Sequence, residues 1–193
     1  TPQTVTVTGV NDVAVDGNQT STITAAVDDA NSDDGYDAVE NQTVSVTTTD
    51  DDTAGYTIVQ SGGSTSVAES GSTDTFTVVL NAQPDSNVVL AITSSDTGEA
   101  TVTSTFTFTS ANWNSAQTVT VTGVDDNIID GTITSTITIA VNDGSSDNNF
   151  DAVADQTVSA TTTDNDVAGF TIAQSGGSTS VTESGPNDTV TRL

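Results

Sequence analysis

A near-exact internal repeat constrains this chain more than any other feature. Residues 161–170, TTTDNDVAGF, repeat the pattern of residues 47–56, TTTDDDTAGY. Subtracting 50 from 164, the positions of the first aspartate in each run, gives a period of 114 residues. Residues 3–10 recur unchanged at this offset, as residues 117–124. Solenoid repeats are much shorter, at roughly 20–50 residues, so each repeat here is long enough to hold a core of its own.

Apolar residues alternate with threonine through the repeat, a pattern that predicts strands with one buried face. Between about residues 54 and 166 these residues fall into seven short segments separated by turn-forming residues. We therefore predict an all-β fold, with each repeat an immunoglobulin-like, seven-stranded antiparallel β-sandwich. The predicted inward positions are Tyr56, Ile58, Phe76, Val78, Leu80, Val88, Leu90, Ile92, Phe106, Phe108, Val119, Val121, Ile133, Ile137, Ile139, Val141, Val158 and Ala160.

The chain is strongly acidic: it has 27 Asp and Glu, one basic residue, no His and a formal net charge of −26. This charge excludes ordinary nucleic-acid binding, because few basic side chains are present to neutralise phosphates. It excludes attraction to anionic membranes for the same reason. Direct insertion into a membrane is not expected either, because no apolar run approaches the roughly 20 residues of a span. Such a surface attracts cations instead.

The acidic residues gather in the predicted loops, whereas outward strand positions are almost all Thr or Ser. In a seven-stranded sandwich, the loops after strands one, three and five open at one end, where the last strand also finishes. Clustered carboxylates repel strongly without a cation, and oxygen donors without His or Cys favour Ca2+ over Mg2+. We predict bound Ca2+ there, with a solvated acidic surface as the alternative. The residues at this end are Glu69, Asp96, Glu99, Asp125, Asp126, Asp130, Asp164 and Asp166.

A second acidic cluster is predicted at the opposite end of the repeat. The loop of residues 142–155 should face the end of the preceding repeat there. We expect an inter-repeat Ca2+ site that stiffens the joint, with a flexible acidic loop as the alternative. The loop contributes Asp143, Asp147 and Asp151, and the preceding repeat contributes Asp50, Asp51 and Asp52.

The repeat carries a Glu in the first turn (SVAE at residues 66–69, SVTE at 180–183), TFTFTSANWN followed by QTVTVTGVDD, and a terminal DND. Together these motifs resemble the Calx-beta domain. The resemblance is strongest to the form found in tandem in large bacterial surface adhesins of the RTX type. It implies sandwiches that bind Ca2+ at one end through Glu69, Asp96, Asp125, Asp126, Asp164 and Asp166. The matching acids in the other repeats are Asp12, Asp16 and Glu183.

The resemblance also sets the phase of the repeats. Residues 1–52 would be the last three strands of one repeat, residues 53–166 a complete repeat, and residues 167–193 the start of a third. In the first of these, Asn11 stands where the complete repeat has Asp125, which should weaken its site. The two partial repeats cannot bury a core alone, so we expect them to fray or to pair with neighbouring molecules.

The sequence bears on three classes of function. The first is a structural role, as Ca2+-rigidified extender repeats of a secreted or cell-surface adhesin, whose partners are the adjacent repeats and whose adhesive ligand binds elsewhere. The second is a Ca2+-dependent ligand- or carbohydrate-binding module, for which an aromatic content of 4% offers little support. The third is an enzyme, which we do not expect, because His and Cys are absent and no aromatic-lined cleft accompanies Glu69 and Glu99. We predict the structural role and an extracellular location.

Overall fold

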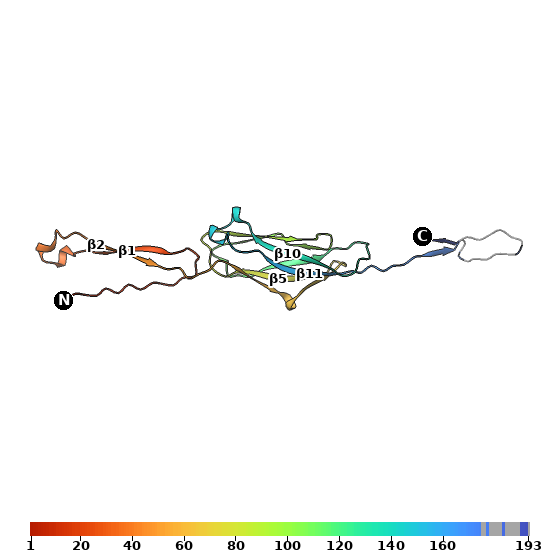
Figure 1. Ribbon diagram of the computed structural model, residues 1–193, viewed down its shortest axis with the longest axis horizontal. Coiled ribbons are helices and arrows are strands. Elements are labelled where there is room, and N and C mark those ends of the chain that lie inside the picture. The colour runs from red at the N-terminus through yellow and green to blue at the C-terminus, as the bar shows by residue number, and fades with distance from the viewer. Residues whose placement is uncertain (175–176, 178–182, 184–189, 193) are drawn as a thin grey trace.

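The computed structural model describes residues 1–174, 177, 183 and 190–192. Figure 1 shows an elongated molecule with a β-sandwich at its centre. The N-terminal segment forms a hairpin beyond one end of the sandwich, and the chain leaves the other end as an extended strand (Figure 1). No helix among the described residues is both long and apolar enough to cross a membrane.

Two sheets form the sandwich, which confirms the predicted all-β fold. The four-stranded sheet has the order β3 (Tyr56–Gln60), β5 (Thr73–Leu80), β9 (Gln117–Gly123), β7 (Ala100–Val102). The five-stranded sheet has the order β4 (Thr65–Ala68), β11 (Gln156–Thr163), β10 (Ile133–Val141), β6 (Val88–Ser94), β8 (Thr105–Phe108). Short 3-10 helices lie in the loops: η1 (Asp29–Asn31), η2 (Asp34–Tyr36), η3 (Ser61–Gly63), η4 (Asp143–Ser145) and η5 (Asn148–Phe150).

The sandwich has two strands more than the seven predicted, β4 and β7, and the pairing of β4 with β11 is parallel. Between β3 and β4, Gly62 and Gly63 adopt φ values of 63° and 83°, which residues with a Cβ rarely adopt. This turn lets the first predicted strand cross from one sheet to the other. Strand β7 is three residues long, too short to give a periodic signal in the sequence.

The predicted inward positions form the core. Phe76, Val78, Leu90, Val119 and Ile137 are all buried. Ile58, Phe106, Ile133 and Val141 are partly buried, since they lie on edge strands or at strand ends. Sequence periodicity missed three core residues. Val67 and Ala100 lie in β4 and β7, the two strands that were not predicted, and Phe150 is fully buried in the loop after β10.

The N-terminal segment reproduces part of the sandwich. Strands β1 (Gln19–Ala25) and β2 (Gln42–Thr48) pair with the register Gln19↔Thr48, which recurs as Ile133↔Thr162 in β10 and β11. Residues 3–10, however, form no strand, although the same sequence makes β9. The prediction of a strand at residues 4–8 is therefore wrong for this chain: β9 lies between β5 and β7, and residues 4–8 have no such neighbours. The C-terminal segment contributes the short pair β12 (Ile172–Gln174) and β13 (Val190–Arg192).

The division at residues 52/53 and 166/167 stays a prediction. The buried core lies wholly between Tyr56 and Ala160. All residues of β1 are exposed, as is Val5 at 80%. The buried core thus belongs to the sandwich, and the N-terminal hairpin exposes apolar residues.

Candidate metal centre

The acidic end of the sandwich is assembled from four segments that backbone hydrogen bonds tie together. The N–H of Glu69, directly after β4, donates to the Thr163 carbonyl at the end of β11 (3.1 Å). The N–H of Val124, directly after β9, donates to the carbonyl of Glu99 (2.8 Å), which precedes β7. The ends of β4, β9 and β11 and the start of β7 therefore meet, as the predicted loop arrangement requires.

Gly123 allows β9 to approach the turn after β4. A Cβ at this position would lie 2.1 Å from the Ala68 carbonyl oxygen, a distance that no side chain could accept. The Gly123 N–H donates to the Ser72 carbonyl across the same contact (3.0 Å). The glycine of the VTGV run is thus required by the packing that brings the loop after β9 close to Glu69.

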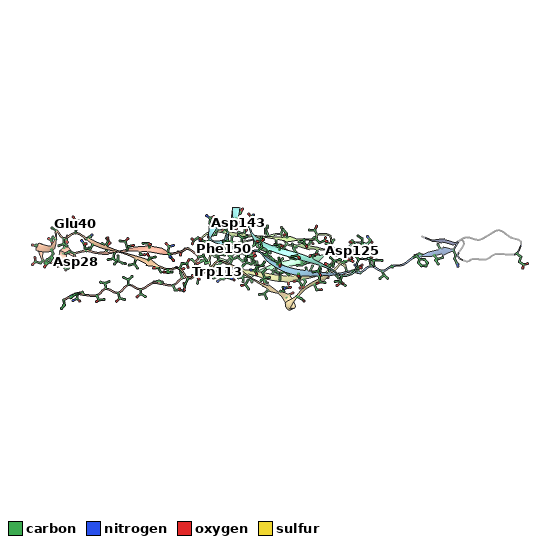
Figure 2. All side chains as sticks on the ribbon, in the orientation of Figure 1. Asp28, Glu40, Trp113, Asp125, Asp143 and Phe150 are labelled. Carbon is green, nitrogen blue, oxygen red and sulfur yellow. The ribbon has the colours of Figure 1, made fainter. Side chains whose placement is uncertain are left out.

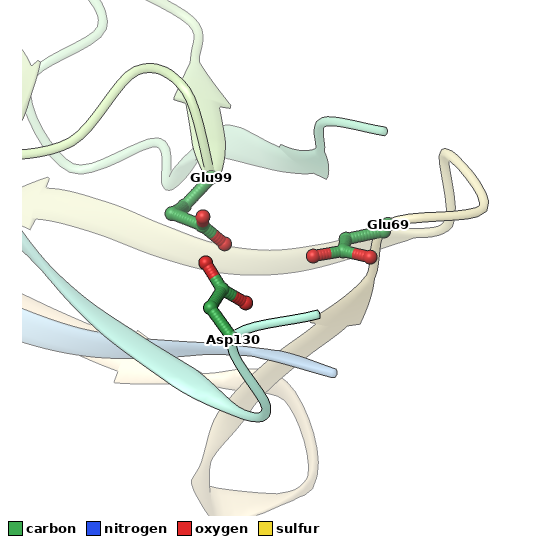
Figure 3. Close-up of side chains that lie close together, drawn as sticks. All are labelled: Glu69, Glu99 and Asp130. Atoms are coloured by element: carbon green, nitrogen blue, oxygen red, sulfur yellow. The ribbon is translucent and has the colours of Figure 1, made fainter. Parts of the chain in front are cut away.

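The carboxylates form two overlapping groups. Glu69, Glu99 and Asp130 each place one carboxylate oxygen within 4.8 Å of the others, and Figure 3 shows the three side chains converging from separate segments. Glu69, Asp164 and Asp166 form a second group by the same distance. Glu69 belongs to both groups, so a carboxylate at this position could bridge two cations.

Two of these side chains are buried: Glu69 is 1% exposed and Glu99 is 6% exposed. Glu69 Oε1, Glu99 Oε2 and Asp166 Oδ2 are buried without a hydrogen-bond donor. A charged carboxylate oxygen that is removed from water without a hydrogen-bond donor or a counter-charge opposes folding. The single basic residue, Arg192, lies in β13, outside the sandwich.

The pKa shifts record the same crowding. Burial raises the pKa of Glu99, and the charges of Asp130 and Glu69 raise it further. At Glu69 the Asn165 N–H lowers the pKa, but burial and the neighbouring carboxylates outweigh it and the pKa rises overall. Burial, followed by the charge of Asp164, raises the pKa of Asp166.

Asp164 is the exception in the cluster, because backbone donors hold its charge. The N–H groups of Asp166 (2.6 Å) and Gly131 (2.9 Å) donate to its two oxygens, and these hydrogen bonds lower its pKa. Asp164 thereby fixes the loop after β9 against the tail after β11. The direction of its pKa shift is therefore opposite to that of Glu69, Glu99 and Asp166.

The remaining predicted residues at this end lie on the rim. Asp125 Oδ1 accepts from the Asn165 side chain (2.9 Å), Asp126 Oδ1 from the Ile128 N–H (2.6 Å), and Asp96 Oδ1 from the Gly98 N–H (3.0 Å). Asn165 was missed as a site residue. Its N–H also donates to Glu69 Oε2 (3.1 Å), so it joins Asp125 to the centre of the cluster. The sequence signal for this role was its position between Asp164 and Asp166 in the terminal DND motif.

The first repeat preserves part of this arrangement. Asp50 accepts from the N–H groups of Gly17 (2.8 Å) and Asp52 (2.9 Å), as Asp164 does from the residues 114 positions later. Burial raises the pKa of Asp52, and the charges of Asp51, Asp50, Asp12 and Asp16 add to this effect. Asp12, Asp16, Asp50, Asp51 and Asp52 therefore lie near one another, close to the end of β2.

The predicted inter-repeat Ca2+ site stays a prediction. Asp147 is 5% exposed, and its oxygens accept hydrogen bonds from the N–H groups of Ser86 (2.8 Å) and Asn149 (2.9 Å). It therefore holds the loop after β10 to the loop after β5. Within the described residues, neither carboxylate group suited to a metal contains Asp143, Asp147 or Asp151, or any of Asp50, Asp51 and Asp52. Three other residues of this loop, Asn149, Ala152 and Val153, line a small pocket together with Asp52. Figure 2 shows Asp143 and Asp125 toward opposite ends of the sandwich.

Glu183, the matching acid of the third repeat, is an exposed turn residue. The residues on either side of it lie outside the described part of the chain. Its predicted role as a ligand stays a prediction.

No family model matches the chain, and no curated protein matches it. Among solved structures, it is similar to domains 4 and 5 of the S-layer protein SbsC, at 26% identity over 63% of this chain and 52% of that chain, with a TM-score of 0.38. Domains 1–6 of SbsC match at 21% identity over 77% of this chain and 23% of that chain, with a TM-score of 0.39. The E. coli chaperone DraB matches at 10% identity over 60% of this chain and 59% of that chain, with a TM-score of 0.41. Membership of the Calx-beta family stays a prediction.

Proposed function

We propose that the acidic end of the complete repeat binds Ca2+ and that the chain is a Calx-beta-like extender segment of a secreted or cell-surface adhesin. The observation that carries this proposal is the set of three buried carboxylate oxygens without donors, on Glu69, Glu99 and Asp166. A solvated acidic surface would leave these groups exposed. A divalent cation supplies the positive charge that no side chain of the sandwich provides.

The donor set favours Ca2+ over other metals. All side-chain ligands are carboxylates, which hard cations prefer, and neither His nor Cys occurs in the chain. Ca2+ takes about 6–8 oxygens in flexible geometry, whereas Mg2+ demands a near-ideal octahedron. Two groups sharing Glu69 suit two cations with one bridging carboxylate. The rim residues Asp125 and Asp126 add charge that favours either ion.

The cation would connect segments that are distant in the sequence. Glu69 follows β4, Glu99 precedes β7, Asp130 precedes β10 and Asp166 follows β11. Without the cation these carboxylates repel, and the loops that carry them are pushed apart. With Ca2+ in both groups, which share Glu69, the four segments are held together and this end of the repeat stiffens. Extracellular modules bind Ca2+ with dissociation constants on the order of 10⁻⁴ to 10⁻³ M, so stiffening would follow export from the cell.

Calorimetric titration of the full chain with Ca2+ and Mg2+, after treatment with chelator, tests the proposal. We expect saturable Ca2+ binding, weaker Mg2+ binding, and a marked loss of affinity in Glu99→Gln, which keeps the shape of the side chain and removes its charge. The matched control is Asp85→Asn, a single charge removed from an exposed residue outside the cluster. Absence of Ca2+ binding, or equal binding by both variants, would contradict the proposed site.

A further inference from the structure

The loop after the first repeat's β9-equivalent segment pairs with the second repeat. The N–H of Val15 donates to the Gln83 carbonyl (3.0 Å), and the N–H of Gln83 donates to the Val13 carbonyl (2.7 Å). Ala14 and Gln83 thus form an isolated parallel β-bridge. Gln83 follows β5, at the end of the sandwich opposite the carboxylate cluster. This contact joins two repeats through backbone groups alone.

Two side chains complete the contact. The Asn149 side-chain amide donates to the Val15 carbonyl across the joint (2.6 Å). The Val15 side chain packs against the core of the second repeat together with Ala54 and Val153. Three hydrogen bonds and one apolar side chain therefore connect the repeats. The carboxylates of Asp143, Asp147 and Asp151, which were predicted to form the joint, take no part in these hydrogen bonds.

The same loop in the complete repeat is uncovered. The period of 114 places Ile128 and Ile129 at the positions of Ala14 and Val15, between Asp126 and Asp130 as those two lie between Asp12 and Asp16. Ile128 is 62% exposed and Ile129 is 57% exposed. These two adjacent branched apolar side chains are exposed and lie outside the core of the sandwich.

We propose that residues 127–129 are a docking surface for the Gln83 edge of another copy of this repeat, as residues 13–15 are in the observed joint. The docking repeat must offer a free backbone N–H and a free carbonyl after its β5 strand and a side-chain amide at the position of Asn149. It must also offer an apolar surface against which Ile129 can pack. The second repeat of this chain offers all three to Val15. Consecutive repeats are then held in one orientation by a clamp that uses no charged group.

The position of the clamp links it to the carboxylate cluster. Asp126 and Asp130 bracket the docking residues, and the Ile128 N–H donates to Asp126 Oδ1 (2.6 Å). In the first repeat the Ala14 N–H donates to Asp12 Oδ1 (3.0 Å) in the same way. A cation held by these acids would fix the loop in its docking shape. The hydrogen bonds of the clamp do not themselves need the cation.

Distance measurements between two spin labels on the full chain test the clamp. The chain has no Cys, so Thr22→Cys and Thr107→Cys, on exposed positions of β1 and β8, would carry the only labels. We expect a single narrow distance peak in Ca2+, lost when Val15→Ser and Asn149→Ala are combined. The matched control combines Val13→Ser and Asn148→Ala, whose side chains make none of these hydrogen bonds. A narrow peak in the joint variant, or a broad peak in the unmodified joint, would overturn the proposal.

A second arm tests the exposed copy of the surface. The full chain is lengthened after Leu193 by residues 80–166, which completes a third repeat, and labels are placed at Thr136 and at the equivalent of Thr107 in the third repeat. We expect a narrow peak that Ile129→Ser abolishes; if Ile129→Ser leaves it unchanged, residues 127–129 are not the docking surface. Repeating both arms in chelator separates this inference from the calcium proposal. A peak that stays narrow without Ca2+ supports the clamp and counts against calcium as the source of stiffness.

Discussion

Glu99→Gln should change the thermal stability of the protein in opposite directions with and without Ca2+. Glu99 is 6% exposed, with one oxygen lacking any donor and with carboxylate oxygens of Glu69 and Asp130 within 4.8 Å. Glutamine has nearly the same shape but no charge. In chelator the substitution removes repulsion and should stabilise the fold. In Ca2+ it removes a charged ligand and should destabilise the fold.

The expected magnitude follows from the distance between Glu99 and Asp130. Two unit charges 4.8 Å apart repel by about 3 kcal/mol at an effective dielectric constant near 20. Asp130 is exposed, so solvent screening reduces the gain from removing this pair to about 1 kcal/mol. For a unit of this size, that corresponds to a rise in melting temperature of roughly 3–5 °C in chelator.

The effect in Ca2+ follows from linkage between binding and folding. At a free Ca2+ concentration of about 100 times the dissociation constant, binding adds about 2.7 kcal/mol to stability. A loss of affinity of about 30-fold, within the range of roughly 10–100-fold seen when even an outer partner of a metal is removed, leaves about 0.9 kcal/mol. The loss of about 2 kcal/mol exceeds the gain from reduced repulsion. The variant should then melt below the unmodified protein.

Calorimetric melting of both proteins, in chelator and over a series of Ca2+ concentrations, is the assay. The two curves of melting temperature against Ca2+ concentration should cross. Asp85→Asn, measured in parallel, should run parallel to the unmodified protein because its carboxylate lies outside the cluster. If Glu99→Gln melts lower in chelator by as much as in Ca2+, Glu99 has a structural role and the reasoning from repulsion is refuted.

Three further predictions rest on the same structure. In the presence of a chelator, the free energy of unfolding should fall as the pH rises above 4.5, the ordinary pKa of a Glu side chain. The raised pKa of Glu99 makes the native state bind more protons than the unfolded state. Melting curves over a range of pH would contradict this if stability rose with pH. Gly123→Ala should abolish folding, because its Cβ would lie 2.1 Å from a carbonyl oxygen, whereas Gly9→Ala at the same place in the first repeat meets only a methyl group at 3.5 Å; circular dichroism of the two variants would show the contrast. Tyr56→Phe should cost about 1–3 kcal/mol in urea unfolding, because its buried hydroxyl donates to the Ile139 carbonyl (2.6 Å) and accepts from the Gln156 N–H (3.0 Å).

Alternation of apolar residues was sufficient to predict most of the core, since Val119 and Val121 or Ile137 and Ile139 can be buried together only on one face of a strand. It could not predict which copy of a sequence becomes a strand. Residues 117–123 form β9 between β5 and β7, while the identical residues 3–9 form none. A strand needs a hydrogen-bonding neighbour, and that neighbour is a property of the whole repeat. Pattern therefore specifies the buried face, and topology decides whether the strand forms.

The candidate site shows a similar division. The order of loops in a sandwich was enough to bring Glu69, Glu99 and Asp130 to one end. Sequence gave no reason to expect that Glu69 and Glu99 would be buried while Asp130 is exposed. It also gave no way to separate Asp147, whose oxygens accept two backbone N–H groups, from acids free to bind a cation. Acidic composition identifies a loop, whereas the number of backbone donors around each oxygen decides what that oxygen can do.

The burial of Glu69 and Glu99 is the step that connects fold to function. An acidic protein gains solubility from exposed carboxylates, and it gains nothing of that kind from two glutamates removed from water beside other acids. Each buried carboxylate opposes folding unless a positive charge joins it, and this sandwich contains no basic side chain. Under the proposed function, such a site makes the rigidity of the repeat depend on an external cation. With the proposed docking surface, a repeat that has its cation site at one end and the Gln83 edge at the other extends in one direction, each loop being fixed by its own cation before it meets the next repeat.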